Sequence, residues 1–100
     1  MQKISVYWRD IPSQVIIKRG RTRGKAALPL RFQEAIDRAA MKAGRGGSDA
    51  YIADWRRETV PLEASGEPEA LAAQAASDWE TQYDDERLKA LVANLGLEPA

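Results

Sequence analysis

Residues 3–18 of the sequence read KISVYWRDIPSQVIIK. Apolar and polar side chains alternate through the first half of this stretch, so Ile4, Val6 and Trp8 would share one face of a strand. Residues 10–13 are typical of a turn, because the proline fixes φ and the aspartate can bond to the turn backbone. The residues after the turn are again β-branched. The stretch therefore predicts an antiparallel hairpin.

Three helices are expected after the hairpin. The first begins near Pro29, since proline is tolerated in a first turn, and ends at Ala43, before a glycine. The second runs over residues 68–83 and the third over residues 84–95, so that residues 69–95 hold two acidic helices. Residues 61–68 are expected to be a linker, because they include proline, glycine and serine and show no periodicity.

Residues 50–58 allow two interpretations. Tyr51, Ile52 and Trp55 favour a strand, whereas Ser48 as an N-cap with helical spacing behind it favours a short helix. A hairpin alone is marginally stable, so we expect a third strand here. The predicted fold class is α+β: one domain over residues 1–100, with a small antiparallel sheet covered on one face by about three helices.

The composition excludes several function classes. The chain has 100 residues, and 44% of them are hydrophobic, which argues against general disorder. No apolar run is long enough to span a membrane, and the N-terminus turns polar too early for a signal peptide, so a cytoplasmic protein is expected. Cysteine and histidine are both absent, which removes Ser-His-Asp and Cys-His catalysis and the usual zinc sites. We expect no cofactor and no bound metal, and the sequence favours a non-enzyme.

The formal net charge of zero conceals two oppositely charged halves. Residues 1–50 carry 11 basic and 4 acidic side chains, and residues 51–100 carry 4 basic and 11 acidic ones. Such asymmetry points to an anionic partner for the basic half or to attraction between the halves.

The basic charge is densest in residues 18–25, which read KRGRTRGK and are expected to form a loop. This loop could be solvated, could bind an anionic partner, or could pack on the acidic half of its own chain. It is not a nucleotide-binding P-loop, because three residues separate its glycines rather than four and Ala26 replaces the Ser or Thr that would hold magnesium.

Aromatic and arginine side chains recur together beside this loop. Tryptophan, tyrosine and arginine dominate binding hot spots, although buried tryptophans with surface arginines would give the same pattern. The candidate residues for binding a partner or an anion are Tyr7, Trp8, Arg9, Asp10, Arg19, Arg21, Arg23, Lys25, Trp55 and Arg56.

Several of these residues belong to segments that resemble a known family. The segments are VYWRDIPSQV (6–15), KRGR (18–21), LRFQEAIDRAA (30–40), SDAY (48–51) and WRR (55–57). Together they resemble the small bacterial virulence factor family, which is related to a module of conserved virulence factor C. The resemblance covers about residues 3–57, and the remainder is similar only in being acidic, alanine-rich and helical. It implies no catalytic mechanism, since the family name describes an effect on virulence.

We therefore expect a non-catalytic binding or adaptor module that engages a protein or an anionic partner through the basic loop and the Trp/Arg surface. One alternative is a nucleic-acid-binding protein that uses the same loop. Another, suggested by the gene neighbourhoods associated with the resembling family, is an accessory protein of corrinoid- and folate-dependent methyl transfer. No membrane partner is expected.

Overall fold

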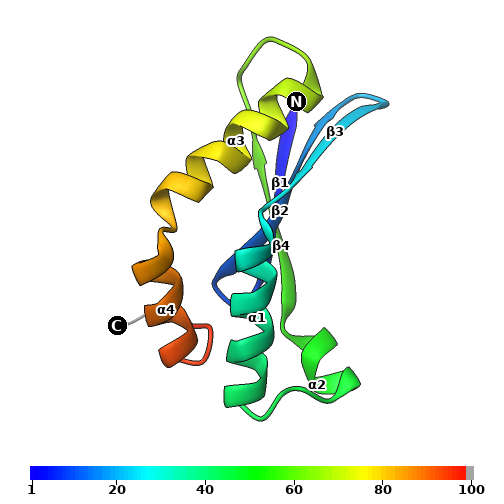
Figure 1. Ribbon diagram of the computed structural model, residues 1–100. Coiled ribbons are helices and arrows are strands. Elements are labelled where there is room, and N and C mark those ends of the chain that lie inside the picture. The colour runs from blue at the N-terminus through cyan, green and yellow to red at the C-terminus, as the bar shows by residue number, and fades with distance from the viewer. Residues whose placement is uncertain (99–100) are drawn as a thin grey trace.

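The computed structural model describes residues 1–98, and for Ser48 its backbone alone. The elements in chain order are β1 (Gln2–Trp8), β2 (Ile11–Arg19), β3 (Thr22–Ala27), α1 (Leu30–Lys42), α2 (Ser48–Ala53), β4 (Trp55–Pro61), α3 (Pro68–Gln82) and α4 (Asp85–Ala93). The strands form one antiparallel sheet in the order β3-β2-β1-β4, and α3 lies along its upper half in the view of Figure 1. The predicted α+β class is confirmed.

The predicted hairpin is present as β1 and β2, but its turn is shorter than expected. Only Arg9 and Asp10 lie between the strands, and Arg9 adopts a positive φ of 53°. Pro12 lies inside β2, next to the point where the register between Val6 and Tyr7 shifts. A bulge tolerates proline, which cannot donate to the ladder. The prediction of a turn over residues 10–13 was therefore wrong from residue 11 onward.

The predicted basic loop is mostly β-structure. Lys18 and Arg19 end β2, a two-residue turn follows, and β3 begins at Thr22. The first turn residue, Gly20, has a φ of 58°, and glycine adopts this conformation without strain in tight hairpins. Apart from one threonine, β3 lacks β-branched residues, so its conformation follows from pairing with β2 rather than from its own propensity.

Residues 50–58 contain both of the structures that were considered. The backbone is helical through Ala53, and β4 starts at Trp55. The expected third strand is thus wrong for residues 50–53 and right from residue 55, and it continues to Pro61, into the predicted linker. In the sheet this strand lies beside β1.

The three longer helices match the prediction to within about two residues at each end. α3 packs against β2 and β3, while α1 packs against α4 and β2. Arg31 of α1 donates to the carbonyls of Glu80 and Tyr83 at 2.9 and 2.6 Å, which satisfies acceptors at the end of α3. The buried core is Trp8, Ile11, Val15, Ile17, Phe32, Ala35, Ile36, Ala39, Ala40, Ala72, Ala76, Trp79, Tyr83, Leu88 and Leu91.

The strand register assigns each strand side chain to one face, because directly paired residues point to the same side. Tyr7 lies 5.5 Å from the ring of Trp79, so the odd-numbered residues of β1 face α3. On this face the sheet and α3 are in close contact, since a Cβ atom on Gly24 would collide with the backbone of Pro68. The even-numbered residues of β1 point to the opposite face.

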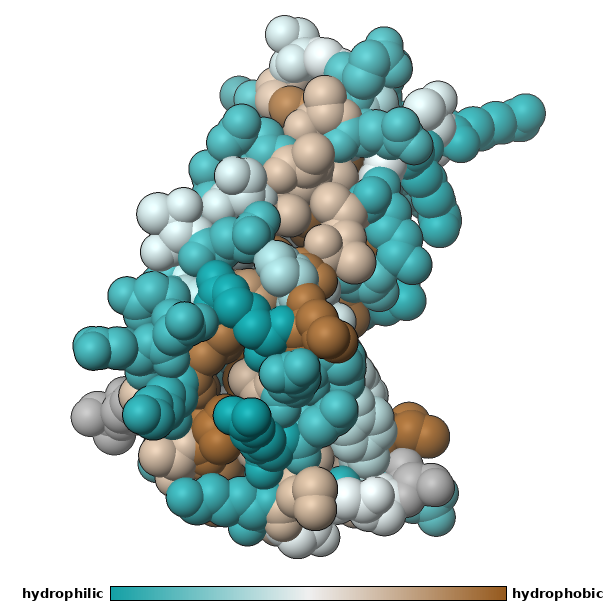
Figure 2. Space-filling model, in the orientation of Figure 1, coloured by the Kyte–Doolittle hydropathy of each residue, from teal (hydrophilic) through white to brown (hydrophobic). Residues whose placement is uncertain are grey.

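On the face of the molecule seen in Figure 2, the apolar residues lie in small separate areas. Figure 2 shows pale brown residues in a narrow strip between hydrophilic side chains, and darker brown residues elsewhere in isolated groups. Within residues 1–98, no helix has the length and apolar character that crossing a membrane requires.

Candidate functional site

The sheet face opposite α3 is the most distinctive surface of the molecule, and we call it the open face. Its middle is apolar, with Ile4 and Ile16 half-buried and directly opposite each other. Its edges are polar and largely exposed. The residues that the register assigns to the open face include Ile4, Val6, Gln14, Ile16, Lys18, Arg23, Lys25, Trp55, Arg57 and Thr59.

The charges on the open face are all of one sign. Its four charged side chains are Lys18, Arg23, Lys25 and Arg57, and the strand register places no carboxylate on it. Lys18 and Arg23 are directly paired across β2 and β3. Like charges in this position destabilise a sheet, so the arrangement has a cost in folding free energy that a bound anion would offset.

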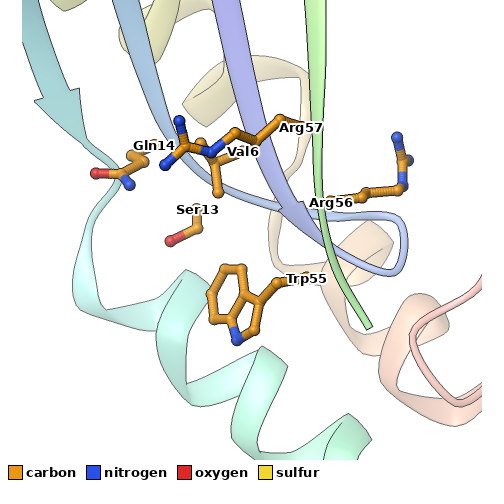
Figure 3. A pocket seen from close by; sticks show the side chains of 6 residues that line it. All are labelled: Val6, Ser13, Gln14, Trp55, Arg56 and Arg57. Carbon is orange, nitrogen blue, oxygen red and sulfur yellow. The ribbon is translucent and has the colours of Figure 1, made fainter. Parts of the chain in front are cut away.

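A hollow of about 550 Å³ lies at one end of the open face, beside α1. It is lined by Val6, Ser13, Gln14, Trp55, Arg56 and Arg57. Figure 3 shows the Trp55 indole on one side of the hollow and the Arg57 side chain reaching along the other, whereas the Arg56 side chain points away. The hollow therefore combines an aromatic wall, a cation and the uncharged polar side chains of Ser13 and Gln14.

Trp8 belongs to the core. Its side chain is 0% exposed, and its indole Nε1 donates to the carbonyl of Tyr51 at 2.9 Å. A Cβ atom on Gly96 would lie 2.8 Å from the Trp8 ring, so the chain after α4 also covers it. This residue fixes the position of its neighbours and is not accessible to a partner.

Arg9, Asp10 and Arg56 lie together in one ion-pair network. Arg9 pairs with Asp54 at 3.2 Å and donates to the carbonyl of Leu95 at 2.8 Å. Arg56 pairs with Asp10 at 3.0 Å and donates to the carbonyl of Arg9 at 2.7 Å. The network links the β1–β2 turn to β4 and to the chain after α4.

Two side chains at this network, Arg56 and Tyr7, have shifted pKa values. Burial acts to lower the pKa of Arg56, but hydrogen bonds to Glu58 and Asp10 outweigh it, and the pKa is raised. The Arg56 guanidinium lies 4.3 Å from the centre of the Tyr7 ring. Burial, reinforced by the charge of Glu58, raises the pKa of Tyr7, so this phenol stays neutral at physiological pH. These side chains bond to one another and stabilise the fold.

The residues of the predicted basic loop divide into two groups. Arg19 points toward the α3 side, where it donates to the carbonyl of Gly66 at 2.8 Å. Arg21, Arg23 and Lys25 are exposed, and within residues 1–98 none of them has an ion-pair partner. The acidic side chains of residues 51–98 therefore form no ion pair with these three cations.

The predicted site residues thus lie in different places, and two of the four cations on the open face were not predicted. Arg23, Lys25 and Trp55 share this face, but Lys18 and Arg57 were not among the predicted residues. Counting every second residue from Trp55 along β4 would have placed Arg57 on the same face as the indole. The sequence therefore contains the alternation that identifies Arg57, but using it requires knowing that β4 begins at Trp55.

The chemical groups on the open face are those of its strand side chains. Its side chains offer guanidinium, ammonium, amide and hydroxyl donors around an apolar centre, without a paired nucleophile and base. Among residues 1–98, no three acidic side chains come together in a group that could hold a metal ion.

The chain was compared with known proteins. No curated protein and no solved structure matches it. A family model described as "Virulence factor" matches residues 6–92, a span that includes α1, α2, α3, all but the last residue of α4, and most of the sheet. Because this match covers far more than half of the sequence, and extends well beyond the segments first noticed, the chain belongs to the virulence factor family.

Proposed function

We propose that the protein is a non-catalytic binding module whose open face binds an acidic segment of a partner protein. The observation that carries the proposal is the single sign of charge on this face. Four cations surround an apolar centre without an acidic strand residue among them, and the pair formed by Lys18 and Arg23 is repulsive in the free protein.

Several contacts would contribute to binding. A positive surface raises the rate of encounter with an acidic partner and excludes basic ones. The apolar centre around Ile4 and Ile16 offers area for burial, at about 25 cal/mol for each Å² removed from water. Carboxylates of the partner would offset the repulsion between the charges of Lys18 and Arg23, and the loss of this repulsion would contribute to the binding free energy.

Protein is favoured over nucleic acid by the scarcity of aromatic side chains on the open face. Modules that bind single-stranded nucleic acid stack several bases on aromatic residues, and Trp55 is the one accessible aromatic residue that the register places here. The apolar positions hold isoleucine and valine instead, which suit the side chains of a protein.

The test uses two probes of similar charge: a labelled deca-glutamate peptide and a labelled oligothymidylate of ten nucleotides. Fluorescence anisotropy should show binding of the peptide that weakens as salt rises, because both partners are charged. The double variant Lys18→Glu/Lys25→Glu should weaken binding by about tenfold or more, as expected for the loss of two charge-assisted contacts.

The control is the double variant Lys42→Glu/Lys89→Glu, which makes the same change in net charge at exposed positions of α1 and α4. If this control weakens binding as much, the attraction depends on net charge and not on the open face. If the oligothymidylate binds more tightly than the peptide, the nucleic-acid alternative replaces the proposal.

A further inference from the structure

The hollow on the open face has a fixed aromatic wall. The Trp55 ring lies 5.8 Å from the Tyr51 ring in an edge-on arrangement, and Tyr51 is stacked on the buried Trp8 at 6.1 Å. The Tyr51 hydroxyl accepts a hydrogen bond from Gln33 of α1 at 3.1 Å. These contacts hold Trp55 from behind, so a ligand would meet a preformed surface and would lose little free energy in ordering it.

The opposite side of the hollow has a cation without a partner. Arg56, its neighbour in β4, pairs with Asp10 and Glu58 at 3.0 and 2.7 Å. In the part of the chain that the structure describes, no acidic side chain pairs with Arg57. Alternation along β4 explains the difference, because the two arginines point to opposite faces of the sheet, as Figure 3 shows.

The size and shape of the hollow limit what it can hold. A volume of about 550 Å³ lies within the range of known ligand sites, which is about 300–1,000 Å³. The hollow opens onto the sheet surface, so a side chain that belongs to a bound segment can enter it. The indole of Trp55 and the side chain of Val6 suit an aromatic ring, and the guanidinium of Arg57 suits a carboxylate.

We infer that the hollow binds an aromatic side chain next to a carboxylate in the partner's acidic segment. The ring lies against Trp55, and the adjacent carboxylate accepts hydrogen bonds from Arg57. Gln14 and Ser13 donate to backbone carbonyls or further carboxylates of the same segment. This inference rests on the proposed function and adds to it the residue type that the partner must present.

The test follows the indole N–H signals of the three tryptophans by NMR while the peptide acetyl-Asp-Phe-Asp-amide is added to the full chain. The Trp55 signal, assigned with the variant Trp55→Phe, should shift with increasing peptide. The signal of Trp8 should stay in place, since its N–H is buried and bonded to Tyr51. Two control peptides replace either both aspartates with asparagine or the phenylalanine with alanine, and each should bind markedly more weakly.

The variant Arg57→Gln should raise the Kd for the peptide by about tenfold, the usual effect of losing a charge-assisted hydrogen bond. Arg38→Gln is the matched control, because it removes the same charge from an exposed position on α1, and it should leave the Kd unchanged. Equal binding of the asparagine or alanine peptide, or a Trp55 signal that does not move, would overturn the inference.

Failure of the inference about the hollow can be distinguished from failure of the proposed function. Deca-glutamate could still bind at the open face while the aromatic peptide neither shifts the Trp55 signal nor binds more weakly to Arg57→Gln. In that case only the inference about the hollow is wrong. If neither peptide binds and the lysine variants have no effect, the proposed function fails as well.

Discussion

A charge reversal at Lys18 should stabilise the protein while it weakens binding. Lys18 and Arg23 face each other directly on the open face, where the Cβ atoms of such pairs are about 5 Å apart. Two like charges about 6 Å apart in water repel by about 0.7 kcal/mol, and an opposite pair attracts by the same amount. Before screening, Lys18→Glu therefore changes the interaction by about 1.4 kcal/mol, and about 1 kcal/mol should remain at low salt.

This gain is measurable in a domain of 100 residues. A stabilisation of about 1 kcal/mol raises the Tm of a domain this size by about 4–8 °C. Thermal unfolding followed by circular dichroism should show the increase at low ionic strength. The difference from the wild type should shrink as salt is added, because salt screens both the repulsion in the wild type and the attraction in the variant.

The variant Lys25→Glu serves as the matched control. Lys25 lies on the same face and strand as Arg23, but its direct partner is Ile16, so its reversal relieves only the weaker repulsions along β3 and on the diagonal to Lys18. It should raise the Tm less than Lys18→Glu does, while both variants weaken deca-glutamate binding. If the Tm of Lys18→Glu at low salt is equal to or lower than that of the wild type, the claim that Lys18 and Arg23 repel each other on the open face is refuted.

Three further predictions concern the fold. Gly24→Ala should lower the free energy of unfolding by about 2–3 kcal/mol, because the new methyl group would collide with the backbone of α3. Gly47→Ala is the control: its methyl group would lie in open space, so it should change the free energy of unfolding by less than about 0.5 kcal/mol. Both values can be measured by urea titration. Arg56→Lys should cost about 1–2 kcal/mol in the same assay, since an ammonium cannot reproduce the bonds that the guanidinium makes to Asp10 and two further acceptors. Burial raises the pKa of Tyr83, so above a pH of about 10 the phenol ionises in the unfolded chain before it ionises in the folded one. The free energy of unfolding of the wild type should therefore fall as the pH rises above about 10. The variant Tyr83→Phe, which has no phenol at this position, should lose less stability between about pH 8 and about pH 11.

The sequence was most informative where local pattern and tertiary structure agree. Alternation in residues 3–9 predicted β1 and its two faces, and the prolines at positions 29 and 68 marked helix starts to within one residue. In each case a short-range physical rule, side-chain period or fixed φ, acts in the same direction as the packing.

The strand β3 could not be predicted from its own residues. Its sequence TRGKAA has only one β-branched residue and includes a glycine, and this composition argues against a strand. The glycine is nevertheless required, because α3 approaches so closely that any side chain at Gly24 would collide with it. Contacts made more than forty residues away in sequence therefore determine this element, and local propensity does not reveal them.

The location of the binding candidates depended on the same long-range information. Arg9, Asp10 and Arg56 resembled a binding surface because arginine beside tryptophan is common there, yet the fold uses them to join separate segments. Because side chains alternate along β4, Arg56 and Arg57 lie on opposite faces of the sheet. A pattern of residue types could not decide between two adjacent arginines without the position of the strand.

The two oppositely charged halves of the sequence now have a structural meaning. Where the halves meet, charges pair: Arg9 and Arg45 with Asp54, and Asp10 with Arg56. The helix α3, which carries acidic but no basic side chains, covers the face opposite the one that holds Lys18, Arg23 and Lys25. The sheet thus separates the remaining positive charges from the acidic groups of α3, and intramolecular attraction through it is weak at such distances. A net charge of zero is compatible with a strongly positive surface because the fold places the compensating charges on the other side of the sheet.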